Sequence, residues 1–348
     1  MESVQIFAAH EKSMHAVAGG SVSVKECEAK EMVKLEVWTE KYRPSGLADV
    51  IGQEHVVKRL REWVKQGSIP NMLFAGPAGI GKTTIALALA RDMYGKHWRQ
   101  NFQELNASDD RGIGIVRGRI KDFASMLPIG ADFKIIFLDE SDALTPEAQQ
   151  ALRRTIERYS GVCRFILSCN YSSRIIEPIQ SRCAVFRLRG LPEKECLQYL
   201  ERITGGEKIN ADQDSLRAVY EVSEGDLRKA TNILQAAAAL GRVSRKVVYD
   251  VAARARPKDV REMLDLALGG RFHDARKKLY SLLIDQGLSG EDIIKEIHRQ
   301  VFSLDVTEQD KLRMIDRIGE SEFRLNQGSS EEIQLEALLA QFLPAAMR

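Results

Sequence analysis

The chain has 348 residues, 44% of them hydrophobic and 29% charged, a globular composition that is long enough for two or three domains. No stretch approaches the roughly 18 apolar residues that a membrane-spanning helix needs. The first residues show neither the basic start nor the apolar run of a secretory signal, and five cysteines without a Cys-x-x-Cys pair argue against a disulfide framework. We therefore expect a reducing, cytoplasmic environment, while the net charge of +2 leaves a nucleic-acid partner open.

The first 34 residues show no clear period and are expected to form a tail. This tail is either a disordered leader or an extension that precedes a natural start at Met32. Regularly patterned sequence begins with VKLEVWTEKYRP, and beyond it short apolar runs bounded by turn residues predict buried strands at 71–76, 102–108, 133–140, 163–170 and 183–189.

Helices are predicted between these strands. One covers 83–95, and another lies between Thr145, its predicted N-cap, and Gly161, with Pro146 in its first turn. Strands that alternate with helices indicate an α/β domain over 35–190, built on a five-stranded parallel sheet with right-handed crossovers.

After Leu191-Pro192 the pattern becomes helical. Amphipathic segments at 193–205 and 225–241 predict a small all-α domain over 191–255, followed by a candidate hinge near Pro257. A helical C-terminal bundle over 256–348 is predicted from segments at 260–270, 272–287, 289–304, 308–328 and 329–343. The pattern Ser329-x-x-Glu332 predicts a capping box at the start of the last segment.

A P-loop pattern, Gly-x-x-x-x-Gly-Lys-Thr, lies between the first predicted strand and the first long helix. Its glycines let backbone N–H groups turn toward phosphate oxygens, and the helix N-terminus adds its dipole. The lysine is expected to contact the β- and γ-phosphates, and the threonine hydroxyl is expected to bind Mg²⁺. The predicted nucleotide-binding residues are Gly76, Pro77, Ala78, Gly79, Ile80, Gly81, Lys82, Thr83 and Thr84.

Polar residues end two of the predicted central strands. Asp139 is expected to hold Mg²⁺ together with Thr83, and Glu140 is placed to polarise an attacking water. Two solvated acids at a strand end are the alternative, but a P-loop upstream favours hydrolysis. Because the carboxyl ends of parallel strands face one ligand crevice, Asn170 is expected to hold the water or the γ-phosphate.

Several segments together resemble the small subunit of archaeal replication factor C, the sliding-clamp loader. They are VWTEKYRP, GPAGIGKTT, LNASDDRGI, KIIFLDESDALT, RFILSCNYSSRIIEPIQSRC and GDLRKATNILQ, and the resemblance spans about residues 35–345. The run Gly76 to Ile80 departs from the common Gly-Pro-Pro-Gly-Thr form without changing the glycines. The resemblance implies an ATP-hydrolysing AAA+ module over 35–190, a helical lid over 191–255, and a collar over 256–348 that joins five subunits.

The resemblance also implies roles at matching positions. Arg182 of Ser-Arg-Cys resembles an arginine finger that reaches the γ-phosphate of a neighbouring subunit, and Arg228 resembles the lid's sensor arginine. Tyr42, Arg43 and Pro44 resemble the segment that lines the adenine pocket. Without the resemblance, Arg182 fits a surface salt bridge, Arg228 a solvated helix face, and Tyr42 to Pro44 an extended lead-in to a domain.

A basic stretch at 109–124 is a candidate DNA contact. Arg117 and Lys121 share a face if the stretch is helical, and Arg111 and Arg119 lie nearby. The resemblance implies that Arg111, Arg117 and Lys121 follow the DNA backbone rather than read bases, and a solvated helix face is the alternative. By the same resemblance, Ile156 and Tyr159 lie on a surface that touches the clamp, unless they pack in the core.

The P-loop and the strand-end acid predict ATP and Mg²⁺ as cofactors, and the resemblance implies an ATP-driven clamp-loader subunit. The expected partners are the replication factor C large subunit and further small subunits in a hetero-pentamer, the sliding clamp, and primer–template DNA. A branch-migration helicase subunit, one alternative, predicts a C-terminal winged helix with a β-hairpin. A structural subunit without hydrolysis, the other, predicts a damaged P-loop or a missing acid, and the sequence shows neither.

Overall fold

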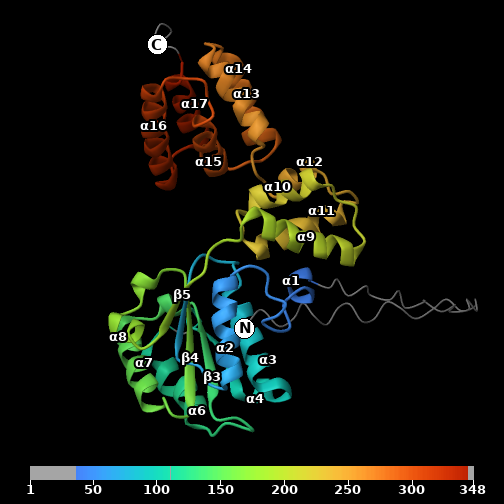
Figure 1. Ribbon diagram of the computed structural model, residues 1–348. Helices are drawn as coiled ribbons and strands as arrows, with labels where there is room; N and C mark the ends of the chain where they lie inside the picture. The colour runs from blue at the N-terminus through green and yellow to red at the C-terminus, as the bar shows by residue number, and fades with distance from the viewer. Residues whose placement is uncertain (1–36, 110, 344–348) are drawn as a thin grey trace, which may run out of the picture. The chain divides into compact units, whose positions relative to one another are not determined.

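The computed structural model describes residues 37–109 and 111–343, so the tail expected at 1–34 lies outside the described residues. One sheet forms the centre of the α/β part (Figure 1). All its neighbouring strands are parallel, in the order β2-β3-β4-β1-β5. The strands are β1 (Met72–Ala75), β2 (Phe102–Asn106), β3 (Lys134–Asp139), β4 (Cys163–Cys169) and β5 (Ala184–Arg187). The predicted five-stranded parallel sheet is confirmed, with each strand one to three residues shorter than predicted.

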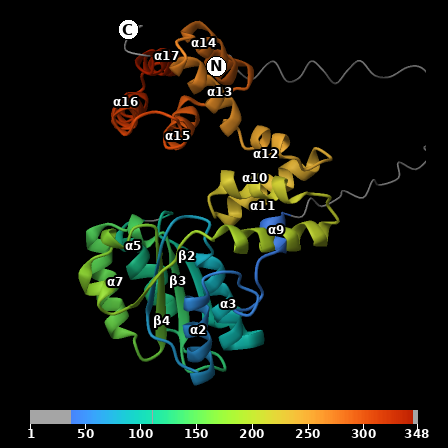
Figure 2. The ribbon, with the colours of Figure 1, turned by 45° about the horizontal axis from the view of Figure 1, so that its top comes forward.

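Helices cover both faces of this sheet (Figures 1 and 2). On one face α2 (Glu54–Gln66) and α3 (Lys82–Tyr94) pack on the strands, and α4 (Trp98–Asn101) lies beside α3. On the other face lie α7 (Pro146–Arg158) and the helical segment 113–125. Because both faces are covered, the central strands are almost wholly apolar, as parallel strands commonly are.

The remaining helices follow the sheet, except for α1 (Trp38–Lys41), which precedes it, and the short α8 (Glu177–Gln180). A first group packs around its own core, with Leu200, Val219 and Leu234 at its centre. Its helices are α9 (Glu193–Glu207), α10 (Gln213–Ser223), α11 (Leu227–Ala239) and α12 (Arg245–Val251). A second core holds α13 (Pro257–Leu268), α14 (Phe272–Tyr280), α15 (Gly290–Val301), α16 (Glu308–Asn326) and α17 (Glu331–Gln341).

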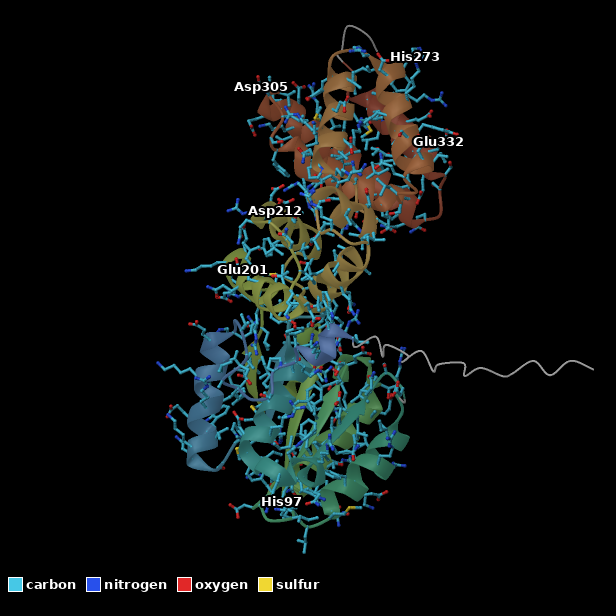
Figure 3. All side chains as sticks on the ribbon, turned by 90° about the vertical axis from the view of Figure 1, so that its right-hand side faces the viewer. His97, Glu201, Asp212, His273, Asp305 and Glu332 are labelled. Atoms are coloured by element: carbon cyan, nitrogen blue, oxygen red, sulfur yellow. The ribbon has the colours of Figure 1, made fainter. Side chains whose placement is uncertain are left out.

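Helix ends follow the capping residues. Thr145 accepts a hydrogen bond from the Ala148 N–H at 3.3 Å, which confirms the predicted cap of α7. Asp212 caps α10 in the same way, at 2.8 Å from the Ser215 nitrogen (Figure 3). The predicted capping box at Ser329 and Glu332 is wrong, because Ser330 caps α17 and accepts from the Ile333 N–H.

Some helices differ from their prediction. Helices α10 and α12 were not predicted as separate elements, and the segment predicted at 272–287 is α14 followed by a π-helical turn over Ser281–Asp285. A second π-helical turn, over Val116–Ile120, interrupts the helix formed by the basic stretch. A π turn carries an extra residue per turn, so the simple i, i+4 alignment expected for Arg117 and Lys121 does not hold there.

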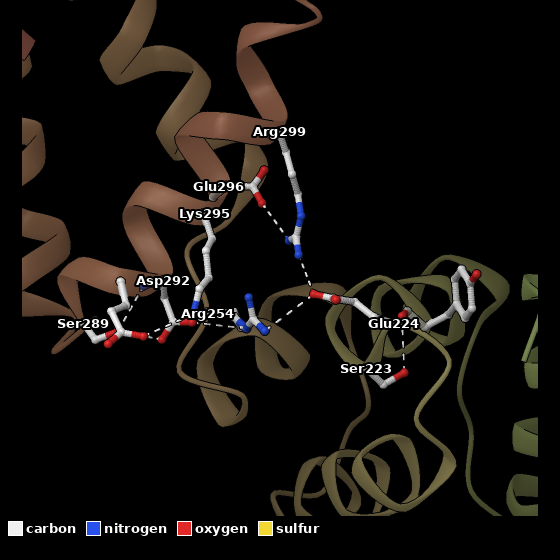
Figure 4. A network of polar contacts seen from close by, with 10 residues as sticks. Ser223, Glu224, Arg254, Ser289, Asp292, Lys295, Glu296 and Arg299 are labelled. Carbon is white, nitrogen blue, oxygen red and sulfur yellow. Dashed lines mark hydrogen bonds and ion pairs between the residues drawn. The ribbon is translucent and has the colours of Figure 1, made fainter. Parts of the chain in front are cut away.

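An ion-pair network joins the first helical group to the second (Figure 4). Glu224, between α10 and α11, pairs with Arg299 of α15 and lies 3.6 Å from Arg254. Arg254 belongs to the predicted hinge and also lies 3.4 Å from Asp292, while Arg299 lies 3.2 Å from the buried Glu296. The predicted hinge segment is therefore tied by ion pairs on both sides.

We expect Gly225→Ala to lower the local stability of helices α9 to α12 by about 3 kcal/mol or more. Gly225 has φ +82°, and an added Cβ would lie 2.7 Å from the Leu191 carbonyl oxygen and 2.8 Å from the Leu191 nitrogen. These are backbone atoms that cannot move aside. Native-state hydrogen exchange of the four helices measures the loss.

Gly241→Ala is the matched control. Gly241 has φ +95° but no atom within 4 Å of the added Cβ, so only the backbone strain of about 1 kcal/mol should remain. Equal losses in the two variants would contradict the steric explanation.

Candidate active site

The P-loop leads from β1 into α3 and lies against the start of α11. Gly79 has φ +70°, and its carbonyl oxygen accepts a hydrogen bond from the Leu227 N–H at 3.1 Å. A Cβ on Gly79 would overlap the carboxylate of Asp226, which caps α11. The loop therefore needs glycine at this position for the close approach of α11.

Lys82 is the centre of the site. Its side chain is buried, and its Nζ donates to the carbonyl oxygens of Gly76 and Pro77 at 2.7 and 2.6 Å, and to Asn170 Oδ1 at 3.1 Å. It forms no ion pair with a carboxylate within the described part of the chain. Burial lowers the pKa of Lys82, and the charge of Asp139 acts in the opposite direction. A buried ammonium without a carboxylate partner is stabilised by a phosphate, because the phosphate supplies the negative charge that the site lacks.

Oxygen ligands lie beside the lysine. The Thr83 hydroxyl donates to Asp139 Oδ2 at 2.8 Å, and Asp139 Oδ1 accepts from the Glu140 N–H at 2.9 Å. A hydroxyl and a carboxylate, with room for water and phosphate oxygens, are the donors that Mg²⁺ prefers. Thr83 and Asp139 therefore fit the predicted metal site, and the strand-end position of Asp139 brings it to the helix that carries Thr83.

Glu140 and Asn170 line the same cleft from the ends of β3 and β4. Glu140 is exposed, has φ +49°, and its carboxylate forms no hydrogen bond within residues 37–109 and 111–343. Asn170 is anchored through its backbone, because its N–H donates to Asp142 Oδ2 at 3.2 Å. The structure thus brings together Glu140, the predicted base, Asn170, expected to hold the water or the γ-phosphate, and the P-loop lysine.

The cleft continues toward the amino-terminal segment and the helices after the sheet. Tyr42, Arg43 and Pro44 line it, as do Ala78 to Thr84 and Arg228. Gly76 and Pro77, at the start of the P-loop, do not line the cleft, and their carbonyls accept hydrogen bonds from Lys82. Lining residues that the sequence analysis missed include Asp49, Val50, Ile51, Tyr199, Arg202, Leu227 and Thr231. Tyr199 and Arg202 are spaced i, i+3 on the helix predicted at 193–205, and this spacing indicates that they share one face of that helix.

Arg182 does not line the cleft of its own chain. Its Nη2 lies 2.6 Å from Glu157 Oε1 of α7, so the surface salt bridge considered from spacing exists. Arg111, Arg117, Arg119 and Lys121 are exposed, as a DNA contact requires. Ile156 of α7 is buried in the core, so the core-packing alternative holds for it, while Tyr159 is half-buried.

The sequence matches two family descriptions. Residues 72–191 match the ATPase family associated with various cellular activities (AAA), and residues 255–341 match the replication factor C C-terminal domain. The replication factor C small subunit of Methanococcus maripaludis strain S2 is 53% identical over 305 residues, covering 87% of this chain and 97% of the relative. The chain belongs to the replication factor C small subunit family. The Archaeoglobus fulgidus small subunit, 51% identical, covers 89% of this chain and 98% of that relative.

Membership of the replication factor C small subunit family confirms the resemblance, and the AAA match confirms an ATPase domain that binds nucleotide. Solved structures include the Thermotoga maritima RuvB Holliday junction branch migration motor, with TM-score 0.52 and 18% identity, over 77% of this chain and 93% of that one. At this identity the likeness shows the fold alone. The winged helix of the helicase alternative is not found, because the described residues after Arg187 form helices without strands. No helix in the described residues is long and apolar enough to cross a membrane.

Proposed function

We propose that this chain, a small subunit of the clamp loader in DNA replication, hydrolyses ATP in the cleft between the P-loop and α11. The observation that carries this proposal is the convergence of Lys82, Thr83, Asp139 and Asn170, joined by direct hydrogen bonds at the ends of β1, β3 and β4. Glu140 and Arg228 line the same cleft. In a P-loop site, this set supplies phosphate binding, metal ligands, a base and charge stabilisation.

Each residue has a chemical role in this proposal. Lys82 exchanges its hydrogen bonds with the Gly76 and Pro77 carbonyls for the phosphate oxygens of ATP. Thr83 and Asp139 hold Mg²⁺, which when bound neutralises charge on the β- and γ-phosphates. Glu140 accepts a proton from the attacking water, which Asn170 orients. Tyr42, Arg43 and Pro44 border the adenine, and Arg228 contacts the γ-phosphate from α11.

Arg182 completes the site of another subunit in the proposed assembly. It does not line the cleft of its own chain, and its side chain is 35% exposed, so its guanidinium is accessible to a neighbour. An arginine supplied from outside stabilises transition-state charge and makes hydrolysis depend on assembly. The proposed neighbours are the large subunit and further small subunits, in a hetero-pentamer whose collar comprises residues 256–348.

The proposed cycle uses ATP to hold the sliding clamp open on primer–template DNA. Arg111, Arg117 and Lys121 follow the phosphate backbone, so loading is independent of sequence. DNA contact triggers hydrolysis, which loosens the subunit interfaces and releases the clamp. The exposure of these three cations supports this role.

The test is steady-state ATP hydrolysis by the chain purified with its large subunit, with primed DNA and clamp added separately and together. We expect clamp and primed DNA together to stimulate the rate of hydrolysis. Arg182→Ala should lower the stimulated rate about a hundredfold or more while ATP still binds. Arg217→Ala is the control, because Arg217 also forms an exposed ion pair, with Glu193 in the lid. A rate of hydrolysis that does not change when the clamp is added would contradict the proposal.

A further inference from the structure

The Arg182 side chain is held by contacts within its own chain. Its Nη2 pairs with Glu157 Oε1 at 2.6 Å, and its Nη1 donates to the Pro178 carbonyl at 2.7 Å and to the Ser181 hydroxyl at 3.4 Å. A free arginine side chain samples many rotamers, and each fixed contact removes some of that freedom. The guanidinium is therefore oriented before any neighbouring subunit arrives.

These contacts leave part of the guanidinium available. An arginine has five N–H donors. Within the described residues, the Nε–H of Arg182 has no partner, and the contacts at Nη1 and Nη2 do not use every remaining hydrogen. The side chain can thus keep its pairing with Glu157 while it donates to phosphate oxygens.

Glu157 is itself held in place. It is the penultimate residue of α7, and the same Oε1 atom accepts from Arg153 Nε, one turn earlier, at 3.1 Å. The two arginines lower the pKa of the Glu157 carboxyl, Arg153 having the larger effect through its hydrogen bond. The carboxylate is therefore a fixed, charged acceptor for Arg182.

Helix stability does not explain this carboxylate. The last turn of a helix lies at the negative end of its dipole, where a cation is favourable and an anion is not. Exposed ion pairs contribute little to stability, and the Glu157 side chain is 42% exposed. An acid at the unfavourable end of its helix dipole, supported within α7 only by an exposed pair with Arg153, points to a role beyond the stability of α7.

We propose that Glu157 is a positioning residue that presets the guanidinium of Arg182 for the γ-phosphate of the neighbouring subunit. This inference rests on the proposed role of Arg182 in trans. Presetting removes the orientational freedom that would otherwise be lost in the transition state, so it acts on kcat rather than on ATP binding.

The experiment uses the assembled complex with clamp and primed DNA. Glu157→Ala is expected to lower the stimulated kcat about tenfold, with KM for ATP changed less than about twofold. Glu157→Gln keeps an oxygen acceptor at the same position, so it should restore most of the rate, to within about threefold of the unmodified complex. Glu147→Ala, an exposed glutamate at the other end of α7, is the matched control. Unfolding temperatures of all variants are compared with the unmodified chain.

A double-mutant cycle separates this inference from the function on which it rests. If Glu157 acts through Arg182, Glu157→Ala adds no further loss to Arg182→Ala. An Arg182→Ala complex with unchanged kcat overturns the role in trans and the inference together. Loss of kcat in Arg182→Ala, with an unchanged or faster Glu157→Ala complex, overturns only the role of Glu157.

Discussion

Lys82→Met is expected to lower kcat/KM for ATP by about a thousandfold or more, because the variant loses the only cation on the P-loop itself. The same change should not destabilise the nucleotide-free chain. Burial depresses the pKa of Lys82 in the folded state, so the charged form is less favourable there than in the unfolded chain. That penalty is present at pH 7 and is relieved only as the pH rises from the folded to the unfolded pKa. Methionine removes it at every pH.

Two melting curves check this prediction, without nucleotide and with ATP. A ligand at about a hundred times its Kd stabilises the folded chain by about 2.7 kcal/mol, so ATP should raise the melting temperature of the unmodified chain and not that of Lys82→Met. Lys58→Met, at an exposed position of α2, is the control and should retain the ATP-induced rise. A nucleotide-free Lys82→Met chain that melts well below the unmodified chain would show that the ammonium stabilises the loop.

Glu140→Gln is expected to lower kcat by about a hundredfold to a thousandfold while ATP affinity stays within about threefold. An amide cannot accept the proton of the attacking water, yet it fills the same space at the end of β3. The exposed Glu140 carboxylate forms no hydrogen bond within the described residues, so the change breaks no structural contact. The variant should therefore hold ATP without hydrolysing it.

Single-turnover hydrolysis and titration with a fluorescent ATP analogue measure the two quantities separately. Glu147→Gln, an exposed position on α7, serves as the control. A variant that binds ATP poorly would show that Glu140 contributes to nucleotide binding. A variant that hydrolyses ATP at the normal rate would show that another residue is the base.

The P-loop and the strand-end residues could be predicted because their positions follow from local rules. A buried apolar run followed by a polar residue defines a strand end, and parallel strands bring such ends to one edge. This rule placed Asp139 and Asn170 near Lys82, and the structure joins Asn170 to Lys82 at 3.1 Å. The glycines and the lysine of the loop form a pattern that needs no tertiary information.

Tertiary packing placed the residues that the sequence analysis missed or left between two alternatives. Ile156 has the helical spacing of either a core or a surface residue, and only the packing of α7 on the sheet decides that it is buried. Tyr199 and Arg202 line the cleft because the Leu227 N–H bonds Gly79, which brings the lid to the P-loop. The partner of Arg182 depends on where α7 ends beside α8, which no local pattern gives.

The separate hydrophobic cores affect how the molecule melts. The sheet domain, helices α9 to α12 and helices α13 to α17 each bury their own apolar side chains, so the chain need not unfold in one cooperative step. Calorimetry should then give a van't Hoff enthalpy smaller than the calorimetric enthalpy. The cleft proposed to bind ATP is lined by the P-loop and α11, and none of its lining residues comes from α13 to α17. Saturating nucleotide should thus merge the first two transitions and leave the collar to melt independently.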